Sequence, residues 1–120
     1  MITENNKIAL YWIQAFNNHD VEALLLLYNE NAIHFSPKLL IHQPQTKGFI
    51  KGKTALRAWW LDAFARLPQL QYELKNTIVN NQQILLEYLR IVPNEPNMMV
   101  AEILEIEAGL IIQSRVYHGA

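Results

Sequence analysis

The fold of this 120-residue chain depends on one stretch, "LRAWWLDAFARLP", residues 56–68. Its apolar side chains recur at the spacing of one face of an α-helix, at Leu56, Trp59, Trp60, Ala63, Phe64 and Leu67. Pro68 cannot continue a helix, and no helical periodicity follows it. The stretch therefore predicts a long helix that ends where the chain changes from helices to strands.

Four strand-like segments follow, separated by turn-forming residues, at positions 70–79, 83–92, 98–107 and 110–118. Upstream, the apolar spacing predicts helices over residues 3–17 and 20–28, the second with Asp20 as its N-cap. A strand is expected at 32–37, a loop at 38–47 and a short strand at 48–52. Helices segregated from a mostly antiparallel sheet predict an α+β domain.

The length suits a single domain spanning residues 1–120 with one hydrophobic core. A net charge of −1 without a basic patch argues against nucleic acid or an anionic membrane as a partner. The chain has no cysteine, which excludes disulfides, thiolate chemistry and cysteine metal sites. The longest apolar run, residues 23–28, is too short to span a bilayer, and no signal-peptide core is found. We expect a cytoplasmic protein.

The segments at residues 83–92 and 102–112, which cover all or part of three predicted strands, are apolar on both faces. One face of the sheet can pack against the helices, but the other must also leave water. A homodimer formed through the back of the sheet would achieve this. A strongly curved sheet that buries the second face locally is the alternative.

The segment "AIHFSP", residues 32–37, combines strand character with polar side chains on one face. Strand alternation places Ala32, His34 and Ser36 on the same side. An apolar strand that directs an imidazole and a hydroxyl to one side is a candidate for lining a site. A structural hydrogen bond from His34 is the other interpretation.

Three stretches together resemble the nuclear transport factor 2-like superfamily, which includes ketosteroid isomerase and the SnoaL-like polyketide cyclases. They are "WIQAFNNHDVEALLLLYNENAIHFSP" (12–37), "IKGKTALRAWWLDAF" (50–64) and "ILEIEAGLIIQSRVYHG" (103–119). The resemblance implies a cone-shaped α+β barrel, with a strongly curved sheet wrapped around the N-terminal helices and a cavity between them. Proteins of this fold include enzymes and non-catalytic modules, so the fold alone does not assign a function.

The resemblance also assigns positions to individual residues. Trp12 matches the tyrosine that helps hold the oxyanion in ketosteroid isomerase, and Ser36 occupies the place of its catalytic aspartate before a proline. Glu102 matches its protonated aspartate, Trp60 a cavity tyrosine, and His118 a cavity aromatic residue. Alternation adds Ser114 and Val116 to the face of His118, and Tyr28 is expected in the aromatic wall.

Ketosteroid isomerisation itself is not expected, because the isomerase's tyrosine and aspartate base are both replaced. The preferred hypothesis is a SnoaL-like protein that binds a small hydrophobic molecule without a cofactor. As an enzyme it would use His34 or His118 to move a proton next to a carbonyl, while protonated Glu102 stabilises the oxyanion. Isomerase, cyclase or dehydratase chemistry would follow. The alternative is a non-catalytic ligand-binding or dimeric assembly module.

Two further alternatives concern the candidate catalytic residues. Glu102 could instead form an ion pair with Arg90 or Arg115. Two histidines and a glutamate can also form a zinc site. Here, however, His34, Glu102 and His118 lie on separate segments and lack the helical spacing of such ligands, so no metal is expected.

Overall fold

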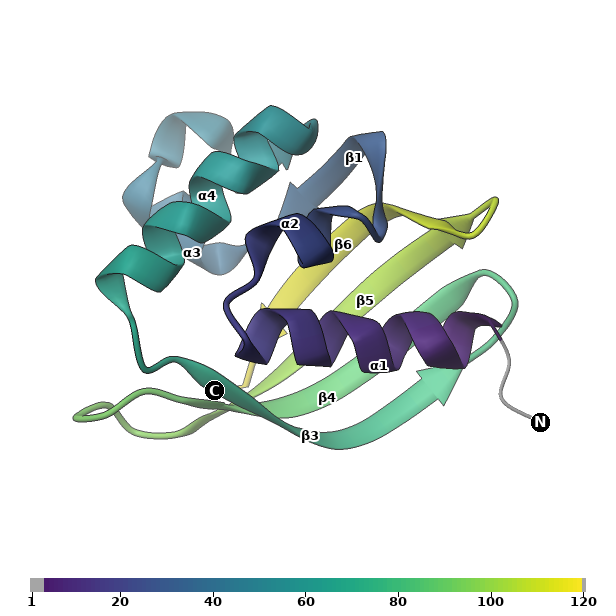
Figure 1. Cartoon of the computed structure of the whole chain (residues 1–120). Helices are drawn as coiled ribbons and strands as arrows, with labels where there is room; N and C mark the ends of the chain where they lie inside the picture. The colour runs from purple at the N-terminus through teal and green to yellow at the C-terminus, as the bar shows by residue number, and fades with distance from the viewer. Residues whose placement is uncertain (1–3, 120) are drawn as a thin grey trace.

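The computed structural model describes residues 4–119, which form helices packed on one side of a curved sheet (Figure 1). The helical elements are α1 (Glu4–Asn17), α2 (Val21–Leu25), α3 (Pro37–His42), the 3₁₀ turn η1 (Pro44–Thr46) and α4 (Lys53–Arg66). The strands are β1 (Tyr28–Phe35), β2 (Phe49–Lys51), β3 (Gln71–Val79), β4 (Gln83–Ile91), β5 (Met98–Glu107) and β6 (Leu110–His118). None of the helices within this range is long and apolar enough to cross a bilayer.

The six strands form one sheet in the order β2-β1-β6-β5-β4-β3. All neighbours are antiparallel except β1 and β6, which run parallel. The sheet is curved. It does not close into a barrel, because β2 and β3 are its two edge strands and do not pair with each other. The predicted α+β class, with N-terminal helices and a mostly antiparallel sheet, is confirmed.

The region around Tyr28 differs from the sequence prediction. The second helix begins after the predicted cap, since the Asp20 side chain accepts a hydrogen bond from the backbone N–H of Ala23 at 3.0 Å. It ends at Leu25, and Tyr28 already belongs to β1, paired with Ile111 of β6. Pairing with a strand far along the chain thus overrides the helical spacing at residues 26–28.

The prediction of a loop over residues 38–47 was wrong, because this segment contains α3 and η1. Ser36 is the N-cap of α3, and its hydroxyl accepts a hydrogen bond from the backbone N–H of Lys38 at 3.2 Å. Pro37 occupies the first helical turn, where its missing N–H costs nothing. The Ser-Pro pair was therefore a helix-start signal.

Strand alternation separates the two faces of the sheet. On β4, Leu86, Tyr88 and Arg90 point inward and are buried, whereas Glu87 points outward. Helix α1 packs across β3 and β4, and α4 packs against β1 and β2. The inward face and the helices therefore enclose the core between them.

The outward face of the sheet carries half-exposed apolar side chains and is not covered by helices (Figure 1). Leu85 lies opposite Ile103, and Leu89 lies opposite Met99, across the β4–β5 pair. Tyr117 on β6 extends this surface. These apolar side chains lie next to one another and could form the contact of the expected dimer. The homodimer stays a prediction.

Placing a charge in the centre of this surface should prevent dimerisation. We expect Ile103→Glu to convert a dimer of the 14.0 kDa chain into a monomer, because a buried carboxylate would face its symmetry mate. Native mass spectrometry measures the change. The control is Leu61→Glu, an equally apolar but exposed position on α4. A wild-type monomer, or an Ile103→Glu dimer, would refute the prediction.

Candidate functional site

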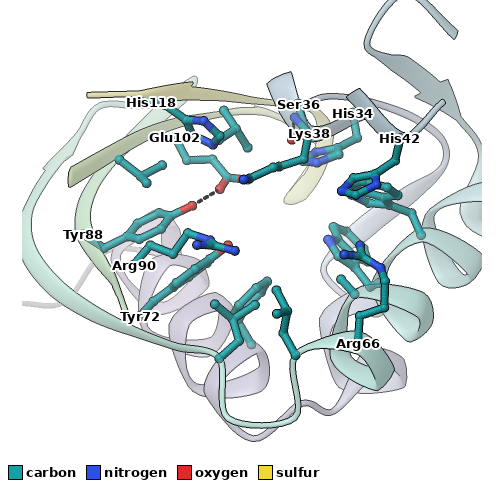
Figure 2. A pocket seen from close by; sticks show the side chains of 18 of the residues that line it. His34, Ser36, Lys38, His42, Arg66, Tyr72, Tyr88, Arg90, Glu102 and His118 are labelled. Atoms are coloured by element: carbon teal, nitrogen blue, oxygen red, sulfur yellow. Dashed lines mark hydrogen bonds between the residues drawn. The ribbon is translucent and has the colours of Figure 1, made fainter. Parts of the chain in front are cut away.

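A cavity of about 280 Å³ lies between the helices and the inward face of the sheet (Figure 2). Its aromatic wall consists of Trp12, Phe16, Trp59, Trp60, Tyr72 and Tyr88. Its polar lining consists of His34, Ser36, Lys38, His42, Arg66, Arg90, Glu95, Glu102 and His118. An apolar wall with a few polar groups is typical of a small-molecule site.

Glu102 is the polar group buried deepest in this lining, with 2% of its surface exposed. Its Oε1 accepts a hydrogen bond from the Tyr88 hydroxyl at 2.7 Å, whereas its Oε2 is buried with no partner. Burial raises the pKa of Glu102 to about 8, and the Tyr88 hydrogen bond offsets this only in part. Near neutral pH the carboxyl is therefore protonated and carries one O–H donor. Figure 2 shows the Glu102 side chain among the groups that line the cavity, with its hydrogen bond from Tyr88.

The alternative ion pairs of Glu102 do not form. Arg90 donates to Glu95 at 2.9 Å, and Arg115 donates to Glu105 at 3.3 Å on the outward face. Glu102 therefore has no cation partner to offset its burial, and burial favours its acid form.

His34 lies at the end of a chain of buried hydrogen bonds. The Trp12 indole N–H donates to the Tyr28 hydroxyl at 3.1 Å, and that hydroxyl donates to Ser114 Oγ at 3.0 Å. Ser114 Oγ lies 2.6 Å from His34 Nδ1. An indole can only donate, so the Tyr28 hydroxyl accepts from Trp12 and its own hydrogen is directed at Ser114 Oγ.

This directionality assigns the tautomer of His34. We infer that the Ser114 hydroxyl, which already accepts from Tyr28, donates to Nδ1, and this leaves the hydrogen of the neutral ring on Nε2. Nε2 has no hydrogen-bond partner among residues 4–119. Burial lowers the pKa of His34 to about 4, so the ring is neutral at physiological pH. His34 is thus an N–H donor and is poorly suited to act as a base.

His118 differs from His34 in both exposure and electrostatics. It lies near the end of β6, opposite Val100, and is only half-buried. Burial lowers the pKa of His118, and the positive charges of Lys38 and Arg90 lower it further. The ring is therefore unprotonated near neutral pH and can accept a proton.

The register of the sheet gives the order of His34, Glu102 and His118 along β6. His34 lies opposite Ser114, and Glu102 lies opposite Val116, two residues further along β6. His118 follows two residues later, so its backbone lies about 13 Å from that of Ser114 at ordinary strand rise. Glu102 therefore lies between the two histidines along the cavity wall.

Most of the predicted site residues line the cavity: His34, Glu102, His118, Trp12, Ser36, Trp60 and Val116. Two do not. Tyr28 and Ser114 are fully buried behind the lining, because their hydroxyls are taken up by the chain that ends at His34. They support the wall and are not placed to contact a ligand. Ser36 lines the cavity, but its hydroxyl already caps α3.

Sequence reasoning missed seven lining residues that carry polar groups: Lys38, His42, Arg66, Tyr72, Tyr88, Arg90 and Glu95. Tyr88 and Arg90 share the inward face of β4, and the inward direction of Glu102 would have identified that face through the antiparallel register. No sequence pattern places Lys38 or Tyr72 at the cavity. Between residues 4 and 119 no three histidine, aspartate or glutamate side chains gather to hold a metal ion.

An α+β fold with a half-enclosed aromatic cavity between a curved sheet and its helices defines the class of this protein. The SnoaL-like domain family matches residues 9–114. The chain belongs to that family. No curated protein matches it significantly.

Solved structures show the same fold. A SnoaL-like protein of unknown function from Burkholderia thailandensis superposes with a TM-score of 0.88 at 20% identity, covering 99% of this chain and 98% of the other. A protein provisionally described as a ketosteroid isomerase, from Kribbella flavida, gives 0.79 at 14% identity, covering 98% and 78%. One provisionally described as a polyketide cyclase, from Sinorhizobium meliloti, gives 0.78 at 14% identity, covering 96% and 99%.

Proposed function

We propose that this SnoaL-like protein binds a small hydrophobic carbonyl compound and moves a proton at the carbon next to the carbonyl, without a cofactor. The observation that carries the proposal is the buried Oε2 of Glu102, which has no partner. Buried polar atoms are almost always hydrogen-bonded, so an orphan on a cavity wall calls for an external partner. A ligand carbonyl oxygen is the matching acceptor.

The proposed step divides the chemistry between donors and a base. His118 removes a proton from the α-carbon, and the electrons of that C–H bond form the C=C bond of an enolate. The negative charge on the enolate oxygen is stabilised by the Oε2–H of Glu102 and the Nε2–H of His34. When the substrate carries a β,γ C=C bond, the enolate is a conjugated dienolate, and return of the proton from His118 to its γ-carbon completes an isomerisation to the α,β-unsaturated carbonyl compound.

This division revises the expected role of His34. Its Nδ1 is occupied by Ser114 and its other nitrogen carries a hydrogen, so it has no free lone pair for a proton. The base is therefore assigned to His118. The reaction is expected between two limits, with activity lost as His118 becomes protonated in acid and as Glu102 ionises above about pH 8.

Exchange of α-hydrogen for deuterium tests the proposal without knowledge of the natural substrate. We expect the protein to accelerate the loss of the α-proton NMR signals of 1-indanone and 1-tetralone in D₂O. His118→Ala should lower the rate by about 100-fold or more, the usual contribution of a general base. Equal rates for the two proteins would refute the assignment of the base.

The matched control is another histidine outside the cavity. His19 lies in the turn after α1, where its ring contacts the Leu70 carbonyl at 2.7 Å and its backbone has a φ of 53°. Asparagine tolerates this conformation, so His19→Asn should keep the exchange rate within about threefold of wild type.

The alternative is a non-catalytic ligand-binding or assembly module. All three tryptophans, Trp12, Trp59 and Trp60, line the cavity, so their fluorescence reports its occupancy. Ketones that change this fluorescence without any accelerated exchange would favour the module. In that case a charge introduced on the outward face of the sheet, as in Ile103→Glu, should impair assembly, whereas His118→Ala should not.

A further inference from the structure

The net charge of the cavity lining is opposite in sign to the net charge of the whole chain. The chain has a net charge of −1, but the cavity lining contains three cations, Lys38, Arg66 and Arg90, and one charged carboxylate, Glu95. Glu102 is protonated near neutral pH, and both lining histidines of the sheet are neutral there. The cavity is therefore electropositive in an otherwise slightly acidic protein.

Arg90 is the buried member of this set, with 8% of its surface exposed. Its Nη1 donates to Glu95 Oε1 at 2.9 Å, and no other hydrogen bond engages its guanidinium among residues 4–119. A guanidinium has five N–H donors in a planar fork that matches a carboxylate. Most of this donor capacity is thus available to a ligand.

Lys38 approaches from the opposite wall. It belongs to the first turn of α3, is half-buried, and forms no ion pair within the described chain. Figure 2 shows the Lys38 ammonium and the Arg90 guanidinium both directed into the cavity, from α3 and from β4. Arg66 is the weaker member, since it is exposed and paired with Asp62 at 2.8 Å.

We propose that the ligand of this cavity is a hydrophobic carboxylate, held at the mouth by Lys38 and Arg90. The inference rests on the proposed function and names its substrate class. The aromatic wall and the limited volume favour a compact organic acid over a polyanion, which would leave charge among the rings.

The two ends of the cavity then recognise different groups. The exposed lining residues His42, Arg66 and Glu95 mark the mouth. Glu102 and His34 are buried further in and donate to a neutral carbonyl oxygen. A carboxylate at the mouth would thus orient the ligand with its carbonyl inward and its α-carbon toward His118.

Paired acids and esters test the proposal by isothermal titration calorimetry. The probes are 1-naphthoate, trans-cinnamate and cyclohexylacetate, each beside its methyl ester. We expect each acid to bind about tenfold or more tightly than its ester, as charge-assisted hydrogen bonds allow. Raising the ionic strength about tenfold should weaken the acids and leave the esters nearly unchanged.

Substitutions locate the effect. Arg90→Met and Lys38→Met should each lower acid affinity about tenfold and leave ester affinity within about threefold. The matched control is Arg57→Met, which removes an exposed guanidinium paired with Glu22 outside the cavity lining and should change neither affinity. Because Arg90→Met and Lys38→Met are tested separately, the proposal stays testable if one of the two variants does not fold.

The outcomes separate this inference from the function on which it rests. Esters that bind as tightly as acids would refute the carboxylate while leaving the hydrophobic cavity supported. An acid preference that survives in both variants would refute the roles of Lys38 and Arg90. If no acid and no ester binds, the proposed function fails, and the inference fails with it.

Discussion

Replacing Glu102 by glutamine is expected to remove a pH dependence from the stability of the protein. The carboxyl ionises near pH 4.5 in an unfolded chain but near pH 8 in the folded one, so the folded state holds one more proton between these values. Stability from this group is therefore present in acid and is lost as the pH rises from 4.5 to 8. Glutamine keeps an oxygen for the Tyr88 hydroxyl and cannot ionise.

The measurement is the free energy of unfolding by urea for wild type and Glu102→Gln across this pH range. The variant should gain on the order of 4 kcal/mol relative to wild type between pH 4.5 and pH 8. Any constant cost of burying the new amide cancels in this difference. A difference that stays constant with pH would show that Glu102 is ionised in the folded protein.

Glu105→Gln is the control on the same strand. The hydrogen bond from Gln83 lowers the pKa of Glu105, on the outward face of the sheet, and Arg115 lowers it further. Its stabilisation is present above the unfolded pKa and is lost as the pH falls, the opposite sign to Glu102. Because the side chain is partly exposed, the effect should stay below about 1 kcal/mol.

Replacing Ser114 by alanine is expected to destabilise the protein by about 2–4 kcal/mol, since it removes one hydrogen bond from each of two buried groups at about 1–3 kcal/mol each. These are the Tyr28 hydroxyl and His34 Nδ1. Urea unfolding measures the cost. Ser36→Ala is the control, because Ser36 is a buried serine whose hydroxyl only caps α3, and it should cost about 1 kcal/mol.

The same variant tests the tautomer of His34. Long-range ¹H–¹⁵N spectra of the wild type should show a hydrogen on Nε2 and none on Nδ1, unchanged from pH 5 to pH 8 because the pKa is about 4. Ser114→Ala should give a mixture of tautomers, whereas Ser36→Ala should not. A wild-type ring with its hydrogen on Nδ1 would contradict the proposed donor role of His34.

Local patterns were sufficient for most of the fold. The helical spacing up to Leu67, the Pro68 stop and the four strand segments predicted the α+β class and its mostly antiparallel sheet. These signals succeed because burial of one apolar face imposes a fixed period on helices and strands. They failed at Tyr28 and at α3, where pairing with β6 and a Ser-Pro cap decided the outcome.

The sequence by itself determined that an imidazole and a carboxyl would lie on apolar strands, since alternation follows from strand geometry. Only the tertiary structure decided what these groups can do. The partners of His34 and Glu102 come from distant segments, so their protonation depends on burial and on contacts that no local pattern contains. Lys38 and Arg90 likewise line one cavity only because the tertiary fold brings α3 and β4 together around it.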